Sequence, residues 1–328
     1  MAGRGEFDLI ADLFAPLAAG YSGALNLRDD AALIDLPAGH RLVITTDALV
    51  AGVHFLPDDP PDLIARKAVR VNLSDVAAMG ARPVGVLVAA CFPRDGGAAW
   101  VERFAAGLAA DVAAFGVPVI GGDTVATPGP ATITVTAVGQ VPAGLALRRD
   151  AAQDGDVLMV SGTIGDGALG LAVQRGRCAG LEAADRDFLI DRYRLPRPRV
   201  SLGPALAGVA RACLDVSDGL LGDLGHICRA SGLGAVVDVE RVPLSVAARV
   251  AVAIDESVLR SAVLCGGDDY ELLFTVAPDR VAEAEEAARQ AGVSVSAIGA
   301  MVAGGGVMVR WAGGIPEPAG DDASWRHF

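Results

Sequence analysis

Short apolar segments alternate along the chain with longer segments of helical periodicity. β-Branched and apolar residues run together, as is typical of strands, at residues 43–47, 84–92, 117–122 and 131–141. Apolar residues recur every three or four positions, as on the buried side of a helix, over residues 61–79 and 98–115. The first half of the chain is therefore predicted to be an α/β domain.

The second half repeats this alternation after a polar connector. A strand over residues 157–162 is predicted to precede a glycine-rich helix, and a helix is predicted over 217–231, with Ser217 as its N-cap and Gly232 as its stop. Further elements are predicted as strands at 235–239, 271–276 and 307–311 and a helix at 279–291. The fold class is thus α/β to α+β. The expected division is an N-terminal domain over residues 1–142, a connector over 143–156 and a C-terminal domain over 157–328.

Composition narrows the classes of function. The chain has 328 residues, 52% of them hydrophobic, and its 27 basic and 40 acidic side chains give a net charge of −13. This acidic balance argues against nucleic acid or an anionic membrane surface as partner. The longest apolar run, residues 84–92, is too short to cross a bilayer, and the N-terminus lacks the apolar core of a secretion signal. Five cysteines without a CxxC pair predict free thiols in a reducing compartment, so a soluble cytoplasmic protein is expected.

The lysine content limits how a phosphate can be bound. Lys67 is the only lysine and follows Arg66, so the phosphate-binding pattern GxxxxGK[ST] is absent. A nucleotide would have to be bound by metal ions, arginines and backbone amides.

Aspartates occupy the predicted strand ends and helix starts. Asp47 and Asp123 each end a strand, Asp215 and Asp218 lie where a helix begins, and Asp30 lies with Asp29 between two apolar segments. Carboxylates in such places can converge on the ligand crevice of an α/β sheet. Taken alone, each is more often a turn or cap residue.

Asp75 is harder to explain as a turn or cap residue, because it stands between Val71 and Ala78 in the apolar stripe of a predicted helix. Buried carboxylates are retained where they are paired or bind a metal. A salt bridge to an arginine is one explanation, and a cation cluster with the other aspartates is the favoured one. Carboxylates together with threonine and serine hydroxyls select hard cations such as Mg²⁺, and the four histidines have no zinc-site spacing. Phosphoryl transfer from a nucleotide is the reaction class that this indicates.

Other motifs have two explanations each. The glycine-rich residues 162–170 either cradle a phosphate or allow close helix packing. The glycines of residues 265–271 mark either a tight turn or a close approach to a ligand. His54 is a ligand contact or an ordinary loop residue, and Arg148 and Arg149 contact phosphate or only solvate the connector.

Taken together, the motifs resemble the thiamine-monophosphate kinase family. The resemblance is carried by GEFDLI (5–10), DDAAL (29–33), TTDALVAGVHF (45–55), KAVRVNLSDVAAMGA (67–81), IGGDT (120–124), LDVSDGLLGDLGHI (214–227), GGDDYEL (266–272) and WRHF (325–328). It implies transfer of the ATP γ-phosphate onto thiamine monophosphate, giving thiamine diphosphate and ADP, in thiamine diphosphate biosynthesis. It also implies an N-terminal domain whose strands build a β-barrel across a homodimer, and a C-terminal α+β domain that completes the active site.

The resemblance further implies the site residues. Several Mg²⁺ ions would be bound by Asp30, Thr45, Thr46, Asp47, Asp75, Asp123, Asp215 and Asp218. ATP would contact Gly122, Arg149 and Ser217, and thiamine monophosphate would contact His54, Asp268 and Trp325. No covalent nucleophile or general base is expected, because the acceptor phosphate is already an anion and can attack in line.

Two positions depart from the family, which has glycine in place of Arg28 and glutamate in place of Asp268. Three rival interpretations stay open. They are another ATP-dependent member of the wider superfamily that includes aminoimidazole ribonucleotide synthetase, a non-catalytic Mg–nucleotide binding module, and a two-metal phosphohydrolase.

Overall fold

A four-stranded mixed sheet organises the first half of the chain in the computed structural model, which describes residues 6–320. The strand order is β1 (His40–Val50), β4 (Thr132–Pro142), β2 (Arg82–Pro93) and β3 (Val119–Thr127). Strands β2 and β3 run parallel, and the other neighbours run antiparallel. The four predicted strands are confirmed, with β1 longer at both ends and β3 displaced towards its C-terminal side.

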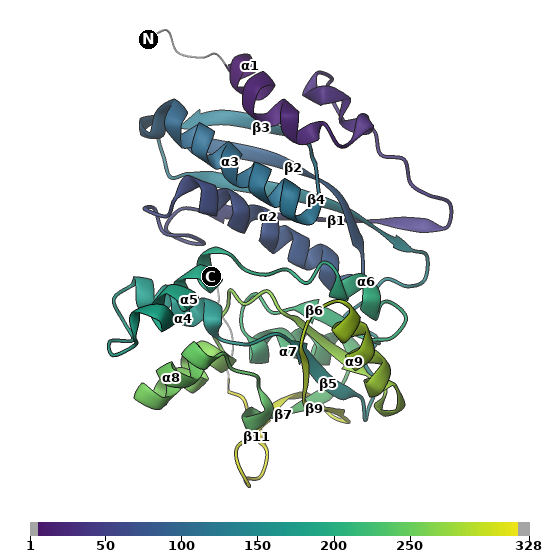
Figure 1. The fold of residues 1–328 in the computed structure, drawn as a ribbon. Helices are drawn as coiled ribbons and strands as arrows, with labels where there is room; N and C mark the ends of the chain where they lie inside the picture. The colour runs from purple at the N-terminus through teal and green to yellow at the C-terminus, as the bar shows by residue number, and fades with distance from the viewer. Residues whose placement is uncertain (1–5, 321–328) are drawn as a thin grey trace. The chain divides into compact units, whose positions relative to one another are not determined.

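Two helices cover one face of this sheet (Figure 1), namely α2 (Pro61–Ala78) and α3 (Gly97–Phe115). The rings of Trp100 and Phe104 on α3 lie 5.4 and 5.2 Å from the ring of Phe92 on β2. Both helices end within one residue of the prediction, and Gly116 closes α3 in the left-handed conformation with φ +64°.

The segment before β1 is helical, which the sequence pattern did not predict. It contains α1 (Glu6–Leu9), a π-helical turn (Ile10–Phe14) and two 3₁₀ turns (Ala15–Ala18 and Ser22–Leu27). Its Ala18 and Ala24 form a small core with Ile120 and Val138 of the sheet. The elements are too short for a helical period to be visible in the sequence.

The sheet face away from α2 and α3 carries exposed apolar side chains. Leu42, Ile44 and Val125 are 42%, 63% and 47% exposed. Along β1 the exposed side chains alternate with partly buried ones, because successive side chains of a strand point to opposite faces. Polar and apolar groups on this face are therefore available to another molecule.

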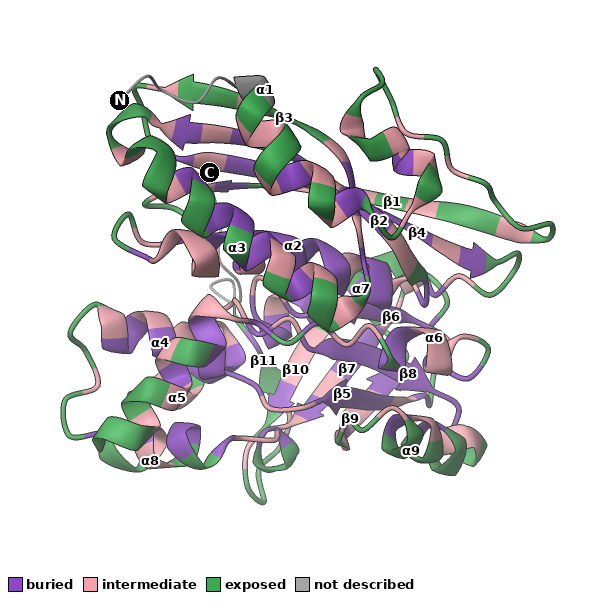
Figure 2. Cartoon of the chain, turned by 45° about the horizontal axis from the view of Figure 1, so that its top comes forward, coloured by how far each residue is buried: buried purple, intermediate pink, exposed green. Residues whose placement is uncertain are grey.

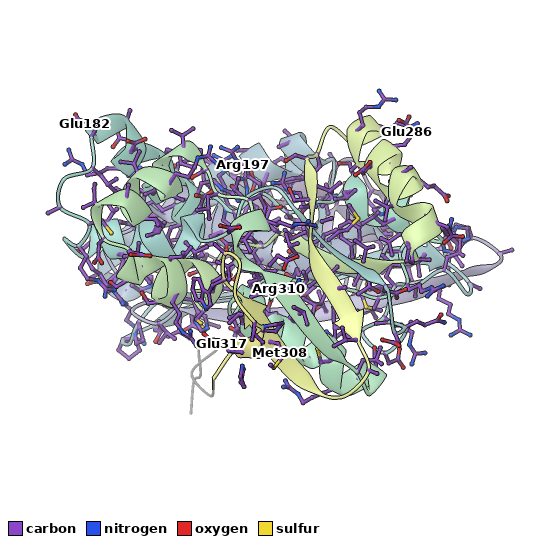
Figure 3. All side chains as sticks on the ribbon, turned by 90° about the horizontal axis from the view of Figure 1, so that it is seen from below. Glu182, Arg197, Glu286, Met308, Arg310 and Glu317 are labelled. Atoms are coloured by element: carbon purple, nitrogen blue, oxygen red, sulfur yellow. The ribbon has the colours of Figure 1, made fainter. Side chains whose placement is uncertain are left out.

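The second half contains a seven-stranded mixed sheet in the order β11-β10-β7-β9-β5-β8-β6. The strands are β5 (Val157–Ser161), β6 (Cys213–Asp215), β7 (Gly234–Asp238), β8 (Leu272–Val276), β9 (Val295–Val302), β10 (Gly306–Arg310) and β11 (Glu317–Pro318). Strands β5, β6 and β8 are buried (Figure 2), as expected for strands covered on both faces. Figure 3 shows Met308 and Arg310 on β10 beside Glu317 of β11, and Arg310 pairs with Asp238 at 3.0 Å.

Helices pack on both faces of this second sheet. They are α4 (Asp166–Gln174), α5 (Ala183–Arg194), α6 (Leu202–Leu206), α7 (Leu220–Ser231), α8 (Val246–Ile254) and α9 (Val281–Gln290). One core joins α4, α5, α7 and α8 to the sheet through Leu158 and Leu273, and the other joins α6 and α9 through Met159 and Phe274. Successive residues of β5 and β8 therefore face opposite cores, and both strands are apolar except at Ser161 and Thr275.

One predicted helix boundary was wrong. Helix α7 begins at Leu220 with Gly219 as its N-cap, so Ser217 is not the capping residue, although Gly232 does end the helix with φ +67°. The main chain of Ser217 is instead held by Asp223, as described below.

The chain divides into one unit of Met1–Val76 with Arg82–Ala143 and a second of Ala77–Ala81 with Gly144–Phe328. Within residues 6–320 neither sheet closes into a barrel. The same part of the chain contains no helix with the length and apolar character needed to cross a membrane.

Candidate active site

Strand β1 and helix α2 bring together three of the expected metal ligands. The hydroxyl of Thr45 donates to Oδ2 of Asp75 at 2.6 Å, and the backbone N–H of Asp47 donates to Oδ1 of Asn72 at 3.0 Å. Thr45 and Asp47 lie two residues apart on the same face of β1, and Asn72 and Asp75 lie three residues apart on one side of α2. This part of the first unit therefore presents a hydroxyl and two carboxylates on one side of the sheet.

Thr46 and Asp123 lie on the opposite face of the same sheet. The hydroxyl of Thr46 donates to the carbonyl of Val135 at 3.1 Å and accepts from the hydroxyl of Thr136 at 3.0 Å. Asp123 pairs in register with Ala89, which is exposed on the face away from the helices.

The strand order also separates Asp123 from Asp47 laterally. Asp47 lies on the edge strand β1 and Asp123 on the other edge strand, β3. Three inter-strand spacings of about 4.8 Å put the two strands roughly 14 Å apart. One cation cannot be bound by both carboxylates of a single chain.

Of the remaining expected residues of the first unit, Asp30 and His54 occupy loops and Gly122 lies within β3. Asp30 is exposed, and its N–H donates to Oδ1 of Asp29 at 3.1 Å. Gly122 has φ +155° and a Cβ there would lie 2.0 Å from the carbonyl oxygen of Val88, so only glycine fits. His54 lies in the turn after β1, where its Nδ1 accepts the N–H of Val50 at 3.0 Å.

Lys67 supports the turn that contains His54. Its side chain is 2% exposed, and its ammonium donates to the carbonyl oxygen of His54 at 3.0 Å. The only lysine therefore has a positioning contact in this structure, to the main chain beside an expected substrate contact.

Two loops bring together the expected residues of the second unit. The loop after β6 carries Ser217 and Asp218, following Asp215 at the strand end, and the loop before β8 carries Asp268. The N–H of Asp268 donates to the carbonyl oxygen of Ser217 at 2.9 Å. Asp268 has φ +71°, a conformation that aspartate tolerates better than glutamate. The change from the family's glutamate thus suits the backbone of this loop.

Arg149 is within electrostatic reach of the loop after β6. Burial raises the pKa of Asp223 to about 7, with the Asp218 charge adding to the rise and Arg149 opposing it. Burial, Arg229 and Arg149 lower the pKa of His226. The Arg149 guanidinium therefore acts on the same end of α7 as the expected ligand Asp218.

The glycine-rich loop before α4 is occupied by a side chain of the protein itself. Oδ2 and Oδ1 of Asp269 accept the N–H groups of Gly165 and Gly167 at 2.7 and 3.1 Å. A Cβ at Gly170 would lie 2.0 Å from the carbonyl oxygen of Leu189 on α5. Of the two explanations for residues 162–170, close packing is the one that these contacts support, since the two amides are not available to a phosphate.

Buried charged side chains form a network around Glu271 and Asp166, next to the glycine-rich loop before α4. Glu271 accepts from the guanidinium groups of Arg192 and Arg199 and from the hydroxyl of Ser161. Asp166 accepts from the hydroxyl of Ser245 at 2.6 Å. Burial raises the pKa of Asp269 well above its usual range, and the nearby Asp166 charge adds to the rise. The loop that carries Asp268 is thus anchored directly after this residue by the buried side chains of Asp269 and Glu271.

The described residues do not form one metal cluster. Within residues 6–320 no three His, Cys, Asp or Glu side chains converge as a group able to hold a metal ion. Trp325 lies outside the described residues. The structure therefore places each expected ligand without assembling all eight in one chain.

Three polar residues of the site were not identified from the sequence. They are Asn72, Asp223 and Asp269, which are 0%, 5% and 1% exposed. Asn72 and Asp223 carried a signal, because a polar residue among apolar helix positions needs a partner, whereas Asp269 lies in a loop and carried none. What the sequence lacked was the identity of that partner.

Comparison with known proteins places this fold and these motifs in a class. Residues 28–141 match the N-terminal domain of the AIR synthase related proteins, and residues 153–312 match the C-terminal domain. The chain belongs to this family of two-domain α/β proteins. Within it, the chain belongs to the thiamine-monophosphate kinases.

The assignment to the thiamine-monophosphate kinases rests on relatives of high sequence identity. The thiamine-monophosphate kinase of Caulobacter vibrioides is 45% identical over 324 residues, which cover 98% of this chain and 90% of that protein. The crystal structure of thiamine-monophosphate kinase from Stenotrophomonas maltophilia K279a has a TM-score of 0.81 at 41% identity and covers 91% of this chain and 96% of that one. A structure described as AaThiL complexed with AMPPCP and TMP has a TM-score of 0.78 at 31% identity and covers 99% of this chain and 97% of that one.

Proposed function

We propose that this chain transfers the γ-phosphate of ATP directly onto thiamine monophosphate, yielding thiamine diphosphate and ADP in thiamine diphosphate biosynthesis. The observation that carries the proposal is the match over 99% of this chain to a kinase structure that is described as a complex with AMPPCP and TMP. The oxygen-rich arrangement around Asp75 supports the same reaction class.

The donor set of β1 and α2 fits a hard cation. The Thr45 hydroxyl is the donor in its hydrogen bond to Asp75, so the lone pairs of the hydroxyl oxygen remain available to a ligand. Asn72 holds the main chain at Asp47, which leaves the carboxylate of Asp47 beside the same face. Thr45, Asp47 and Asp75 would hold Mg²⁺ in the first unit, and Asp215 and Asp218 would do so in the second. When bound, Mg²⁺ supplies positive charge that offsets repulsion between the two phosphate groups.

The acceptor requires no activation by the protein. A phosphate oxygen of thiamine monophosphate is an anion at neutral pH, so in-line attack needs neither a general base nor a covalent nucleophile. Ser217 and Arg149 are proposed to contact ATP, together with Gly122. The role of the protein is then to position the two phosphates and to exclude water.

His54 is proposed to contact thiamine monophosphate as a hydrogen-bond donor. A backbone N–H can only donate, so Nδ1 of His54 accepts the bond from Val50. The neutral ring therefore carries its proton on Nε2, from which it can donate to a phosphate oxygen. Asp268 and Trp325 are the other proposed contacts to this substrate.

A homodimer is proposed to complete the site. Thr46 and Asp123 lie on the sheet face that also exposes Leu42, Ile44 and Val125. Burying these side chains against a second copy removes apolar surface from water, which stabilises association. The proposed barrel is built by the strands of two copies, so Asp123 and Asp30 serve as ligands in the assembled dimer.

The proposed location is the cytoplasm. Cys91, Cys178, Cys213 and Cys228 are free thiols, which supports a reducing compartment.

A single assay tests the reaction and separates it from its rivals. Pure protein is incubated with ATP and Mg²⁺, with thiamine monophosphate or without an acceptor, and the products are resolved by chromatography. Equal amounts of ADP and thiamine diphosphate, formed only with the acceptor, support the kinase. ADP and free phosphate without acceptor indicate a phosphohydrolase, and ATP binding without turnover indicates a binding module. Turnover only with a purine-pathway amide indicates another member of the superfamily.

A further inference from the structure

One carboxyl oxygen in the second unit accepts three successive backbone amides. Oδ2 of Asp223 accepts the N–H groups of Ser217, Asp218 and Gly219 at 3.0, 3.0 and 3.2 Å. Asp223 lies on the first turn of α7 and is 5% exposed. Successive amides that point into one concavity form a nest suited to an anion. Here the protein's own side chain fills the nest, so these amides are not available to a phosphate.

The same loop is held on its other side by the loop before β8. The carbonyl oxygen of Ser217 accepts the N–H of Asp268 at 2.9 Å. Gly219 has φ +120°, and a Cβ there would lie 2.6 Å from the carbonyl oxygen of Cys265. Both backbone groups of Ser217 are therefore engaged, which leaves its hydroxyl as the group that it can present to a ligand.

We propose that Asp223 is a positioning residue that fixes the loop of residues 217–219 and thereby directs the Ser217 hydroxyl and the Asp218 carboxylate. The inference rests on the roles proposed for Ser217 and Asp218 towards ATP and Mg²⁺. A loop that is fixed before binding does not have to be ordered when the nucleotide arrives, and this raises affinity. Asp223 is not proposed to contact substrate or ion; it affects binding by holding the loop of residues 217–219 in place.

The contribution of Asp223 is tested with two substitutions and a matched control. Asp223→Asn retains one carbonyl oxygen that can accept the amides, and Asp223→Ala removes the acceptor of all three backbone donors, of which the Gly219 N–H is buried and the other two are partly buried. The control is Asp156→Asn. Asp156 is fully buried, accepts the N–H of Gln153 at 2.9 Å and pairs with Arg211 at 2.7 Å, so it stabilises a turn elsewhere in the same unit.

Two measurements are made on each full-length variant. Amide hydrogen exchange at residues 217–219 is followed without ligand, and the Kd of the ATP analogue AMPPCP with Mg²⁺ is measured by calorimetry. We expect Asp223→Ala to raise the Kd about tenfold, equivalent to ~1.4 kcal/mol, and to speed exchange of the three amides at least about tenfold. Asp223→Asn should lie between it and the wild type. Asp156→Asn should lower the melting temperature with an unchanged Kd and unchanged exchange at 217–219.

The inference is overturned if the foldable Asp223→Asn variant, and Asp223→Ala where it folds, melt at lower temperature yet keep the wild-type Kd and exchange rates. Asp223 would then stabilise the unit in the same way as Asp156. Failure of the proposed function is distinguishable from this result. It appears as wild-type turnover and Kd in Ser217→Ala and Asp218→Asn, whatever the Asp223 variants do.

Discussion

The hydroxyl of Thr45 donates to Oδ2 of Asp75 at 2.6 Å, across 30 positions of sequence and between a strand and a helix. Asp75 is only half-buried, although its helix neighbours Ser74 and Val76 are buried. The contact thus leaves a carboxylate accessible on an otherwise buried side of α2, beside the strand that carries Asp47. This geometry is the basis of the first prediction.

Asp75→Asn is expected to reduce kcat/KM at least about 100-fold without unfolding the protein. Asp47 lies on the same face, so removing one negative charge leaves the metal-free protein equally or more stable, while Mg²⁺ stabilises it less. Melting temperatures with and without Mg²⁺ and steady-state kinetics check this. Asp62→Asn serves as control, because Asp62 lies on the same helix and pairs with Arg103. Retained turnover with a melting temperature several degrees lower would assign Asp75 to a structural interaction.

Trp325 lies outside the described residues, and its role stays a prediction. The cationic ring of thiamine monophosphate is attracted to an indole face by ~0.5–2 kcal/mol. Trp325→Ala should raise the KM for thiamine monophosphate roughly 3- to 30-fold with less effect on ATP, and Trp325→Phe should recover part of the loss.

Trp311 provides the matched control for Trp325. Its indole N–H donates to Glu317 at 2.9 Å, and its ring packs against the core of the second unit. Trp311→Ala should therefore lower the melting temperature and leave both KM values unchanged. The same behaviour in Trp325→Ala would assign that ring to packing and remove it from the substrate site.

The titration of Asp269 should make the free energy of unfolding depend on pH. Burial raises the pKa of this carboxyl well above its usual range in the folded protein, whereas the unfolded chain releases the proton at about pH 4. Above pH 4 the folded state binds more protons than the unfolded state, so the free energy of unfolding falls as pH rises towards the folded pKa.

Asp269→Asn lacks this titration. As pH rises from 4, the free energy of unfolding of the wild type should therefore fall relative to that of the variant. Urea unfolding of both proteins at several pH values measures the difference. The pKa of Asp223 is also raised, but Asp223 is present in both proteins, so its contribution cancels in the difference between their free energies of unfolding. A difference that is constant or shifts in favour of the wild type would show that Asp269 is ionised throughout.

Ile44→Glu is expected to convert the proposed dimer into a monomer. Ile44 is 63% exposed on the open sheet face, and a charge there opposes burial against a second copy. Light scattering with size-exclusion chromatography measures the mass, and activity should fall with it. Ile315→Glu is the control, because Ile315 is 89% exposed in the second unit, outside the strands. A wild-type mass for Ile44→Glu would exclude this face as the interface.

The sequence by itself determined much about this protein. Its apolar periodicity located the four strands of the first sheet and the helices α2 and α3, because a pleated strand and a helix require different spacings of buried residues. The ordered motifs around Asp47, Asp75, Asp123 and Asp218 identified the family, and with it the reaction. That Thr45 and Thr46 lie on opposite faces was also readable, since neighbours on a strand always do.

Only the tertiary structure decided how these residues are combined. Strand order puts Asp47 and Asp123 on opposite edges of the first sheet, and register puts them on opposite faces. Both depend on pairing between segments far apart in the chain. The same holds for Asp269, whose carboxyl oxygens fill the loop of residues 162–170 that the sequence alone allowed to bind phosphate, and for Asp223, which accepts the amides of residues 217–219. A hydrogen bond requires two groups at about 3 Å, and a local pattern specifies only one of them.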